Sequence, residues 1–244
     1  MAEKNTTTTA TATAVQPDVV TRAKGFWDKF SKPIIYAGSA IIILIGGWYA
    51  YKNFIVLPKE KKASEMIFPA ENLFDKMASG SFNKDSVSLV LNGGNDNGTN
   101  ITGILKVISQ YGGTAAGNRA KYIAGASYLQ IKEFDKAIKY LKEFDGKGAD
   151  QIKSKAYILL GHAYAEKKNT EEALSNYKKA ATVNSKDESI TPYALLMAAS
   201  YADAMGKSKE AIELYKEVKE KFPTNSAATS GDIDKHLARL GVFE

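Results

Sequence analysis

Residues 154–180 read Ser-Lys-Ala-Tyr-Ile-Leu-Leu-Gly-His-Ala-Tyr-Ala-Glu-Lys-Lys-Asn-Thr-Glu-Glu-Ala-Leu-Ser-Asn-Tyr-Lys-Lys-Ala. The spacing of the apolar residues predicts a pair of antiparallel helices. Counted from Ser154 as the first position, positions 7, 8, 11, 20, 24 and 27 hold Leu160, Gly161, Tyr164, Ala173, Tyr177 and Ala180. The small residues Gly161 and Ala173 let the two helices approach closely, and the tyrosines fill the space around that contact.

The same template recurs on both sides of this stretch, which is the tetratricopeptide pattern. Upstream, positions 8, 11, 20, 24 and 27 hold Gly125, Tyr128, Ala137, Leu141 and Phe144. Downstream, positions 8, 11, 15, 20, 24 and 32 hold Ala199, Ala202, Gly206, Ala211, Tyr215 and Pro223. We therefore expect three tetratricopeptide repeats over residues 118–225.

The expected fold class is all-α, with a single N-terminal transmembrane helix followed by a tetratricopeptide-repeat α-solenoid. Residues 58–117 are less regular and are interpreted as a degenerate helical repeat. This region is expected to hold a helix over 63–79 that is interrupted near Pro69, helices over 86–91 and 103–111, and a loop over 92–100. Residues 226–244 are expected to contain a capping helix, 232–240, that shields the last repeat.

Residues 33–51 form a run of 19 residues without a charge. As a helix this run would be about 29 Å long, close to the thickness of the hydrocarbon core of a bilayer. Aromatic rings gather at its far end, where the headgroups of a bilayer would lie. We expect a retained anchor in the lipid bilayer, marked by Pro33, Ile42, Leu44, Trp48 and Tyr51. A cleaved signal peptide and a buried core helix are the alternatives.

Two segments adjoin the anchor. Residues 1–24 include the Thr- and Ala-rich tract 5–14 and are expected to form a flexible cytoplasmic arm. Residues 25–57 combine a lead-in with the anchor. Phe26, Trp27 and Phe30 stand at helical spacing among lysines, which suits either a short amphipathic helix on the membrane surface or an extension of the transmembrane helix. Equal numbers of basic residues flank the two sides of the span, so the positive-inside rule does not decide its orientation. We expect the long domain to lie outside, because long domains can translocate largely regardless of charge.

Composition excludes several classes of protein. The chain has 244 residues, no cysteine and two histidines, which rules out disulfide frameworks and thiolate metal sites. The net charge of +6 divides into +2 over residues 1–32, +3 over 52–62 and +1 over 63–244. A nucleic-acid binder would concentrate charge on its folded domain, so no nucleic-acid partner is expected. No catalytic or phosphate-binding motif is present, and we expect no enzyme, no catalytic residue, no cofactor and no metal site.

Function is therefore expected from a surface. Stacked helix pairs curve into a superhelix with a concave face. By analogy with tetratricopeptide folds, positions 2, 5, 9 and 12 of each first helix line that face, and the candidate partner-binding residues are Arg119, Tyr122, Leu129, Lys155, Ile158, His162, Tyr193, Leu196 and Asp203. This mixture suits an extended or partly folded polypeptide. The alternative is that the groove holds the protein's own helix or one dedicated partner, and His162 is expected to be an ordinary polar residue of the groove.

Besides the anchor and the three repeats, the chain contains three specific stretches: Tyr111-Gly-Gly-Thr-Ala-Ala-Gly-Asn-Arg-Ala-Lys-Tyr122, Phe222-Pro-Thr-Asn-Ser226 and Ile233-Asp-Lys-His-Leu-Ala-Arg239. On these stretches and the repeats, the layout resembles the YfgM family, the ancillary subunit of the bacterial SecYEG translocon. The resemblance implies a short cytoplasmic arm, one span in the bacterial inner membrane and a periplasmic repeat domain. It also implies partnership with SecYEG and with a membrane-anchored periplasmic chaperone of the PpiD type.

Together these features predict a non-enzymatic accessory subunit of the bacterial Sec protein-export translocon. Its repeats would meet exported polypeptides or hold a chaperone near the channel. The alternative is a membrane-anchored periplasmic scaffold for outer-membrane or cell-envelope assembly. A third class is a peripheral enzyme whose site has no recognised motif.

Overall fold

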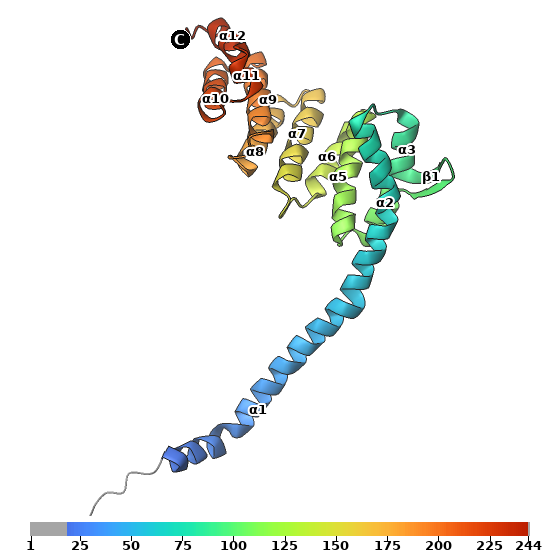
Figure 1. Ribbon diagram of the computed structural model, residues 1–244, viewed down its shortest axis with the longest axis vertical. Helices are drawn as coiled ribbons and strands as arrows, with labels where there is room; N and C mark the ends of the chain where they lie inside the picture. Colours follow the sequence, from blue (N-terminus) through green and yellow to red (C-terminus); the bar gives the residue numbers. More distant parts are fainter. Residues whose placement is uncertain (1–18, 244) are drawn as a thin grey trace, which may run out of the picture. The chain divides into compact units, whose positions relative to one another are not determined.

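The computed structural model describes residues 19–243, which divide into two compact units, residues 19–57 and 58–243. Most of these residues are helical, as the sequence predicts (Figure 1). Of the expected flexible arm, residues 1–18 lie outside the described part. Residues 19–24 differ from the expectation, because the first helix already begins at Val19.

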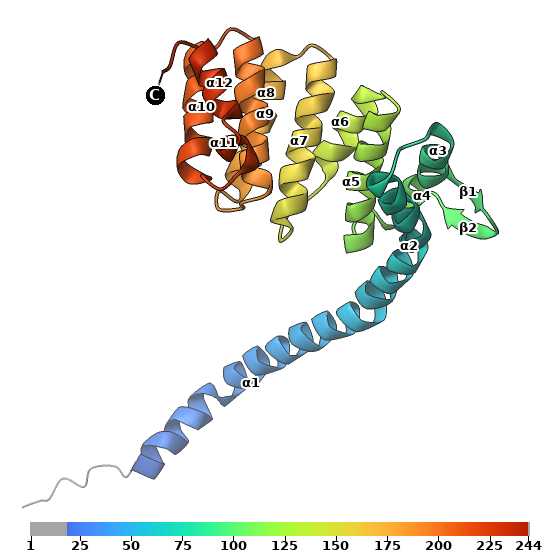
Figure 2. The same cartoon turned by 45° about the horizontal axis from the view of Figure 1, so that its top comes forward.

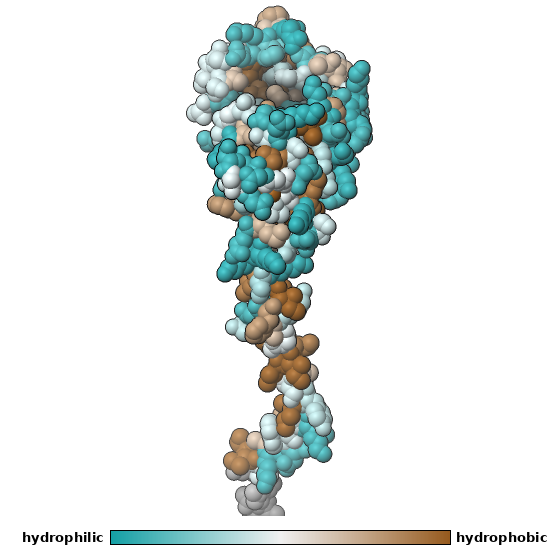
Figure 3. Space-filling model, turned by 90° about the vertical axis from the view of Figure 1, so that its right-hand side faces the viewer, coloured by the Kyte–Doolittle hydropathy of each residue, from teal (hydrophilic) through white to brown (hydrophobic). Residues whose placement is uncertain are grey.

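The first unit is the helix α1 (Val19–Tyr51) followed by the π-helical segment η1 (Lys52–Val56). Pro33 lies inside α1, where its ring removes a backbone donor and crowds the preceding turn. Figures 1 and 2 show that α1 changes direction after its first turns, as helices do at an internal proline. No residue of α1 is buried, and Figure 3 shows apolar side chains exposed along it.

The lead-in and the apolar run belong to one continuous helix, α1, with Pro33 inside it. Within residues 19–243, one helical stretch, Val19–Ser79, is long and apolar enough to cross a membrane. Its length and composition fit a membrane anchor and equally a signal sequence. The residues that marked the expected anchor all lie on α1: Pro33, Ile42, Leu44, Trp48 and Tyr51.

The second unit begins one residue into α2 (Leu57–Ser79), which is followed by α3 (Lys84–Asn92) and α4 (Ile104–Tyr111). The apolar face of α2 is buried through Ala63, Ile67, Ala70, Phe74 and Met77. The expected interruption near Pro69 is wrong, since the helix runs through this residue. Its neighbours Ile67 and Ala70 are both fully buried, so contacts with the core hold the helix on either side of the proline.

A β-hairpin stands where the sequence suggested a loop. Strands β1 (Gly93–Asp96) and β2 (Thr99–Thr102) pair antiparallel, with Asp96 opposite Thr99. Asn97 and Gly98 form the turn, and their φ angles of 47° and 86° suit the tight two-residue turns that twist with a hairpin. The Asn-Gly pair was therefore a hairpin signal inside a stretch whose composition indicated only a loop.

Three helix pairs follow and stack side by side (Figure 2). They are α5 (Ala115–Gln130) with α6 (Phe134–Glu143), α7 (Asp150–Glu166) with α8 (Thr170–Val183), and α9 (Ile190–Ala204) with α10 (Ser208–Lys221).

The three pairs share one turn geometry. The residues after the first helices, Lys132, Lys168 and Gly206, have φ angles of 64°, 58° and 74°. Each next residue donates its backbone N–H to a carbonyl five positions back, at 2.9 Å in all three turns. This is the Schellman arrangement that ends a helix with a left-handed residue. The first pair therefore turns as the other two do.

Small residues let the helices within a pair approach closely. A methyl group at Gly161 would lie 2.4 Å from Cε1 of Tyr177, and one at Gly125 would lie 2.4 Å from Cγ of Leu141. Real side-chain atoms do not sit this close, so both positions require glycine at the present helix spacing. The sequence predicted this role for Gly161.

Ion pairs and a terminal helix join successive pairs. Lys178 Nζ lies 2.6 Å from Glu210 Oε1, Lys207 Nζ lies 2.7 Å from Glu171 Oε2, and Lys167 pairs with Asp135.

After α10 come α11 (Ser226–Thr229) and α12 (Asp232–Arg239). Ile233 and Leu237 of α12 are buried in the core of the last pairs, and α12 contacts α10.

Candidate functional site

The first helices of the three pairs together line a hollow of about 450 Å³. Five of the nine candidate groove residues meet there: Tyr122, Lys155, Ile158, His162 and Tyr193. Leu159, Ser189 and Ile190 complete the lining. The hollow thus has an apolar floor and several polar side chains at its walls.

The five residues differ in how far a partner could reach them. Tyr193 is 46 % exposed, and Lys155 is exposed and forms no ion pair within residues 19–243. Ile158 is only 6 % exposed, because its side chain belongs to the core that joins α7 to the last pairs. Tyr193 and Lys155 are consequently the accessible side chains of the hollow, with Ile158 as part of its floor.

His162 is held by a contact within its own repeat. Its Nδ1 lies 2.9 Å from the hydroxyl of Tyr177, and the two rings meet edge to face with centroids 5.4 Å apart. Burial lowers the pKa of His162 below its ordinary value of 6.5, against the opposing charge of Glu166. The imidazole is therefore neutral near pH 7. Ser200 and Tyr215 make the equivalent contact in the next pair at 3.2 Å, which marks this contact as a feature of the repeat.

A second and larger cavity of about 550 Å³ also includes Tyr122. Its other walls include apolar residues from three helices and one loop: Phe68 and Phe74 of α2, Ile123 of α5, Ile152 of α7, and Phe144, which follows α6. Asp75 of α2 also lines it. Burial, and to a lesser extent the charge of Asp75, raise the pKa of the Tyr122 hydroxyl. Through Tyr122 the two hollows adjoin along the first helices.

The wall made by α2 was not predicted from the sequence. Phe68 is 60 % exposed, although its neighbour Ile67 is fully buried. The one available signal was the helical register of α2, which turns Ile67 toward the core and Phe68 away from it. Nothing in the sequence indicated which part of the chain α2 would face.

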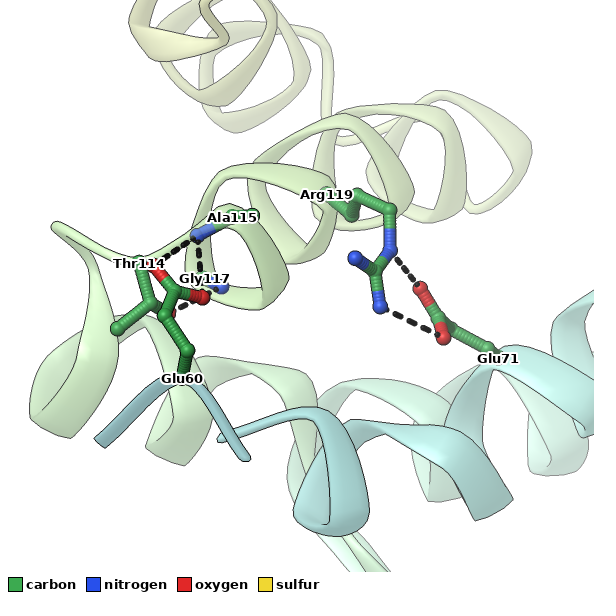
Figure 4. Close-up of polar contacts among 6 residues, drawn as sticks. All are labelled: Glu60, Glu71, Thr114, Ala115, Gly117 and Arg119. Carbon is green, nitrogen blue, oxygen red and sulfur yellow. Dashed lines mark hydrogen bonds and ion pairs between the residues drawn. The ribbon is translucent and has the colours of Figure 1, made fainter. Parts of the chain in front are cut away.

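Polar contacts fasten α2 to the start of α5 (Figure 4). Arg119 donates two hydrogen bonds to the carboxylate of Glu71, at 2.7 and 3.3 Å. Both carboxylate oxygens of Glu60 lie 3.0 Å from the backbone nitrogen of Ala115, the first residue of α5. Thr114 caps the same helix by accepting from the Gly117 N–H at 3.0 Å. A carboxylate at this end also complements the helix dipole.

Arg119 is therefore engaged with the protein's own helix. The hydrogen bond to Glu71 raises its pKa, with burial opposing it. At the other end of the candidate groove, Asp203 is paired with Arg239 of α12, and its side chain is 12 % exposed. Arg119 and Asp203 are thus each paired with a side chain from one of the protein's own helices, α2 and α12 respectively.

The last two candidate residues lie away from the hollow. Leu129 and Leu196 are half-buried and pack against the two main core clusters. Leu129 lies near the end of α5, and Leu196 lies near the middle of α9. Within residues 19–243, no group of three or more His, Asp or Glu side chains is arranged to hold a metal ion.

Comparison with known proteins identifies the repeats. Two tetratricopeptide-repeat models match the chain, over residues 154–187 and 193–225. These ranges contain most of α7 and α9 and all of α8 and α10, the helices that carry the Tyr177 and Tyr215 contacts. The chain thus carries tetratricopeptide repeats in its C-terminal half and a long apolar helix near its N-terminus. None of the curated proteins compared with the chain matches it.

Proposed function

We propose that the protein is a membrane-anchored, non-enzymatic adaptor that binds a polypeptide partner along the first helices of its repeats. Tetratricopeptide repeats act in protein–protein interaction, and the hollow around Tyr193 and Lys155 supports this role. The exposed ring of Tyr193 is the kind of group that anchors protein interfaces. The proposed repeat array also includes α5–α6, which shares the turn of the matched repeats.

The finer form of this proposal is an accessory subunit of the bacterial Sec export translocon. Its partners would be SecYEG, a PpiD-type chaperone and exported polypeptides, with the arm in the cytoplasm and the repeats in the periplasm. The resemblance of the layout to the YfgM family supports this form, together with the single long apolar helix that precedes the repeats. A scaffold for envelope assembly is the second candidate, with the same architecture and other partners.

Purification from membranes in a mild detergent tests the finer form. Tagged protein is expected to retain the translocon, and repeated isolation without it would reject the translocon role in favour of the scaffold. Digestion of the repeat domain by protease in spheroplasts, and its protection in intact cells, is the expected result for a periplasmic domain. Protection in both preparations would place the domain in the cytoplasm.

Substitution within the hollow then tests the binding surface. Tyr193→Ala removes an exposed ring and is expected to weaken partner binding at least about ten-fold, the effect of losing about 1.4 kcal/mol. Glu213→Ala is the matched control, because Glu213 is exposed on the second helix α10, outside the lining of the hollow. Equal binding by both variants would exclude the hollow as the partner site.

A further inference from the structure

The first turns of α1 have one apolar face. At about 100° per residue, Val19, Ala23, Phe26, Trp27 and Phe30 fall within one side of the helix. The basic residues Arg22, Lys24, Lys29 and Lys32 fall at the edges of that side and opposite it. In Figure 3 the lower end of the helix accordingly carries brown side chains on one side and teal side chains on the other.

The aromatic residues of this face are exposed in the part of the chain that the structure describes, residues 19–243. Phe26 and Trp27 are 57 % and 53 % exposed, and Phe30 is 39 % exposed. The ring centroids of Phe26 and Phe30 lie 4.9 Å apart, and Lys29 Nζ lies 5.5 Å from the centroid of the Phe30 ring. Leaving such rings in water is unfavourable, so an apolar medium outside the described chain is the expected cover.

The bend in α1 separates this segment from the apolar run that follows. Pro33 comes directly after Lys32, and Figures 1 and 2 show the helix changing direction after its first turns. A helix that crosses a bilayer from Pro33 onward can therefore lay its first turns along the surface, with the aromatic face inward. Aromatic rings flanked by lysines are typical of helices in the headgroup region.

The charge of the segment selects among lipid surfaces. Residues 19–32 hold four basic side chains and one acidic side chain, Asp28. None of the four cations forms an ion pair with any residue of the range 19–243. An apolar face alone would bind zwitterionic and anionic lipid equally, whereas unpaired lysines and arginines near a surface favour anionic headgroups.

We propose that residues 19–32 form an interfacial helix that binds anionic phospholipid through Arg22, Lys24, Lys29 and Lys32 while its aromatic face enters the headgroup layer. This proposal rests on the membrane anchor of the proposed function. It adds a lipid class and a binding segment that the repeats do not require. Anionic lipid would thereby gather around the N-terminal side of the span.

Lipid-selective quenching of tryptophan tests the proposal with the full chain in proteoliposomes. Trp27 is the reporter in a Trp48→Phe variant, and Trp48 is the reporter in a Trp27→Phe variant. The vesicles are phosphatidylcholine with a small fraction of either brominated phosphatidylglycerol or brominated phosphatidylcholine. Brominated phosphatidylglycerol is expected to quench Trp27 about two- to five-fold more effectively, since one cation near an anionic surface changes affinity by up to about five-fold.

Charge variants give the matched comparison. Replacing Arg22, Lys24, Lys29 and Lys32 with Gln is expected to make the two lipids equal quenchers of Trp27, and high salt is expected to do the same. Replacing Lys59, Lys61 and Lys62 with Gln, on the other side of the apolar run, should leave the preference unchanged.

Three results would overturn the proposal. The first is equal quenching of Trp27 by both lipids in the protein that keeps Arg22, Lys24, Lys29 and Lys32. The second is quenching of Trp48 without any quenching of Trp27, which would leave the anchor intact and remove only the interfacial helix. The third is a loss of the preference for brominated phosphatidylglycerol in the Lys59, Lys61 and Lys62 variant that is as large as the loss in the variant of Arg22, Lys24, Lys29 and Lys32. Failure of both lipids to quench Trp48 would instead refute the anchor itself.

Discussion

Replacing Gly161 with leucine tests how closely the helices of the central repeat approach each other. A first side-chain carbon at this position would lie 2.4, 2.6 and 2.9 Å from Cε1, Cδ1 and Cζ of Tyr177. The tyrosine ring has little room to retreat. It is 3 % exposed, hydrogen-bonded to His162, and in edge-to-face contact with Tyr201 at 5.6 Å.

The expected loss of stability follows from this geometry. Relief of the clash requires α7 and α8 to move apart or Tyr177 to leave its site, and overpacking of this kind costs about 1–3 kcal/mol or more. In a domain of this size each kcal/mol lowers the melting temperature by about 2–4 °C. Gly161→Leu is therefore expected to melt about 2–12 °C below the parent protein.

The assay is thermal unfolding of the full chain in detergent, followed by the helical circular dichroism signal. Gly113→Ala is the matched control, because a methyl group there meets no atom within 4 Å. The melting temperature of Gly161→Ala should lie between those of Gly161→Leu and Gly113→Ala. The next repeat carries Ala199 and Tyr215 at the equivalent positions and buries both, so the repeat can accommodate a methyl group there. A Gly161→Leu protein with the same melting temperature as the parent protein would refute the proposed register of the helix pair.

Three further predictions concern the turns, the α2 contact and pH. Lys168→Gly should raise the free energy of unfolding by up to about 1 kcal/mol, and Gly206→Ala should lower it by about 1 kcal/mol, because both residues have positive φ angles; denaturant titration measures both. A double-mutant cycle with Arg119→Gln and Glu71→Gln should give a coupling of about 0.5–1 kcal/mol that shrinks with added salt, since the Arg119 side chain is 48 % exposed. Because burial lowers the folded-state pKa of His162, the unfolded chain takes up the proton first as pH falls. The stability from the neutral imidazole should thus be present above pH 6.5 and be lost below it, and urea titrations over this range should give a flatter profile for His162→Gln.

The repeats were predictable because their determinants are local in sequence. Gly161 and Tyr177 lie on successive helices that are joined by one short turn. Their spacing in the sequence indicates that the two helices touch at these residues. The contact between His162 and Tyr177 spans 15 residues, and its counterpart between Ser200 and Tyr215 spans the same distance. A periodic pattern of this length can be recognised in a single sequence.

The ends of the candidate groove were not predictable in this way. Arg119 pairs with Glu71, which lies 48 residues earlier in the chain. Asp203 pairs with Arg239, which lies 36 residues later. Both partners come from helices outside the repeat pattern, so analogy with the repeats assigned these charges to a partner instead. The pairing of an exposed arginine with one of many surface carboxylates leaves no periodic trace in the sequence.

The β-hairpin was missed for a different reason. Its strands have four residues each, too few for an alternating pattern to stand out, and they are rich in Gly, Asn and Thr. Composition of this kind indicates a loop unless the turn itself is recognised. The decisive information was the Asn97-Gly98 pair, which favours a tight hairpin turn.

Site-specific photo-crosslinking in cells tests the central claim that the protein acts by holding a polypeptide along its first helices. The photoreactive residue is placed at Tyr193, in the hollow, or at Glu213, exposed on α10. Adducts with a translocon subunit, a membrane-anchored chaperone or exported chains are expected from Tyr193 and not from Glu213. The same adducts from both positions, or adducts from Glu213 alone, would contradict the account.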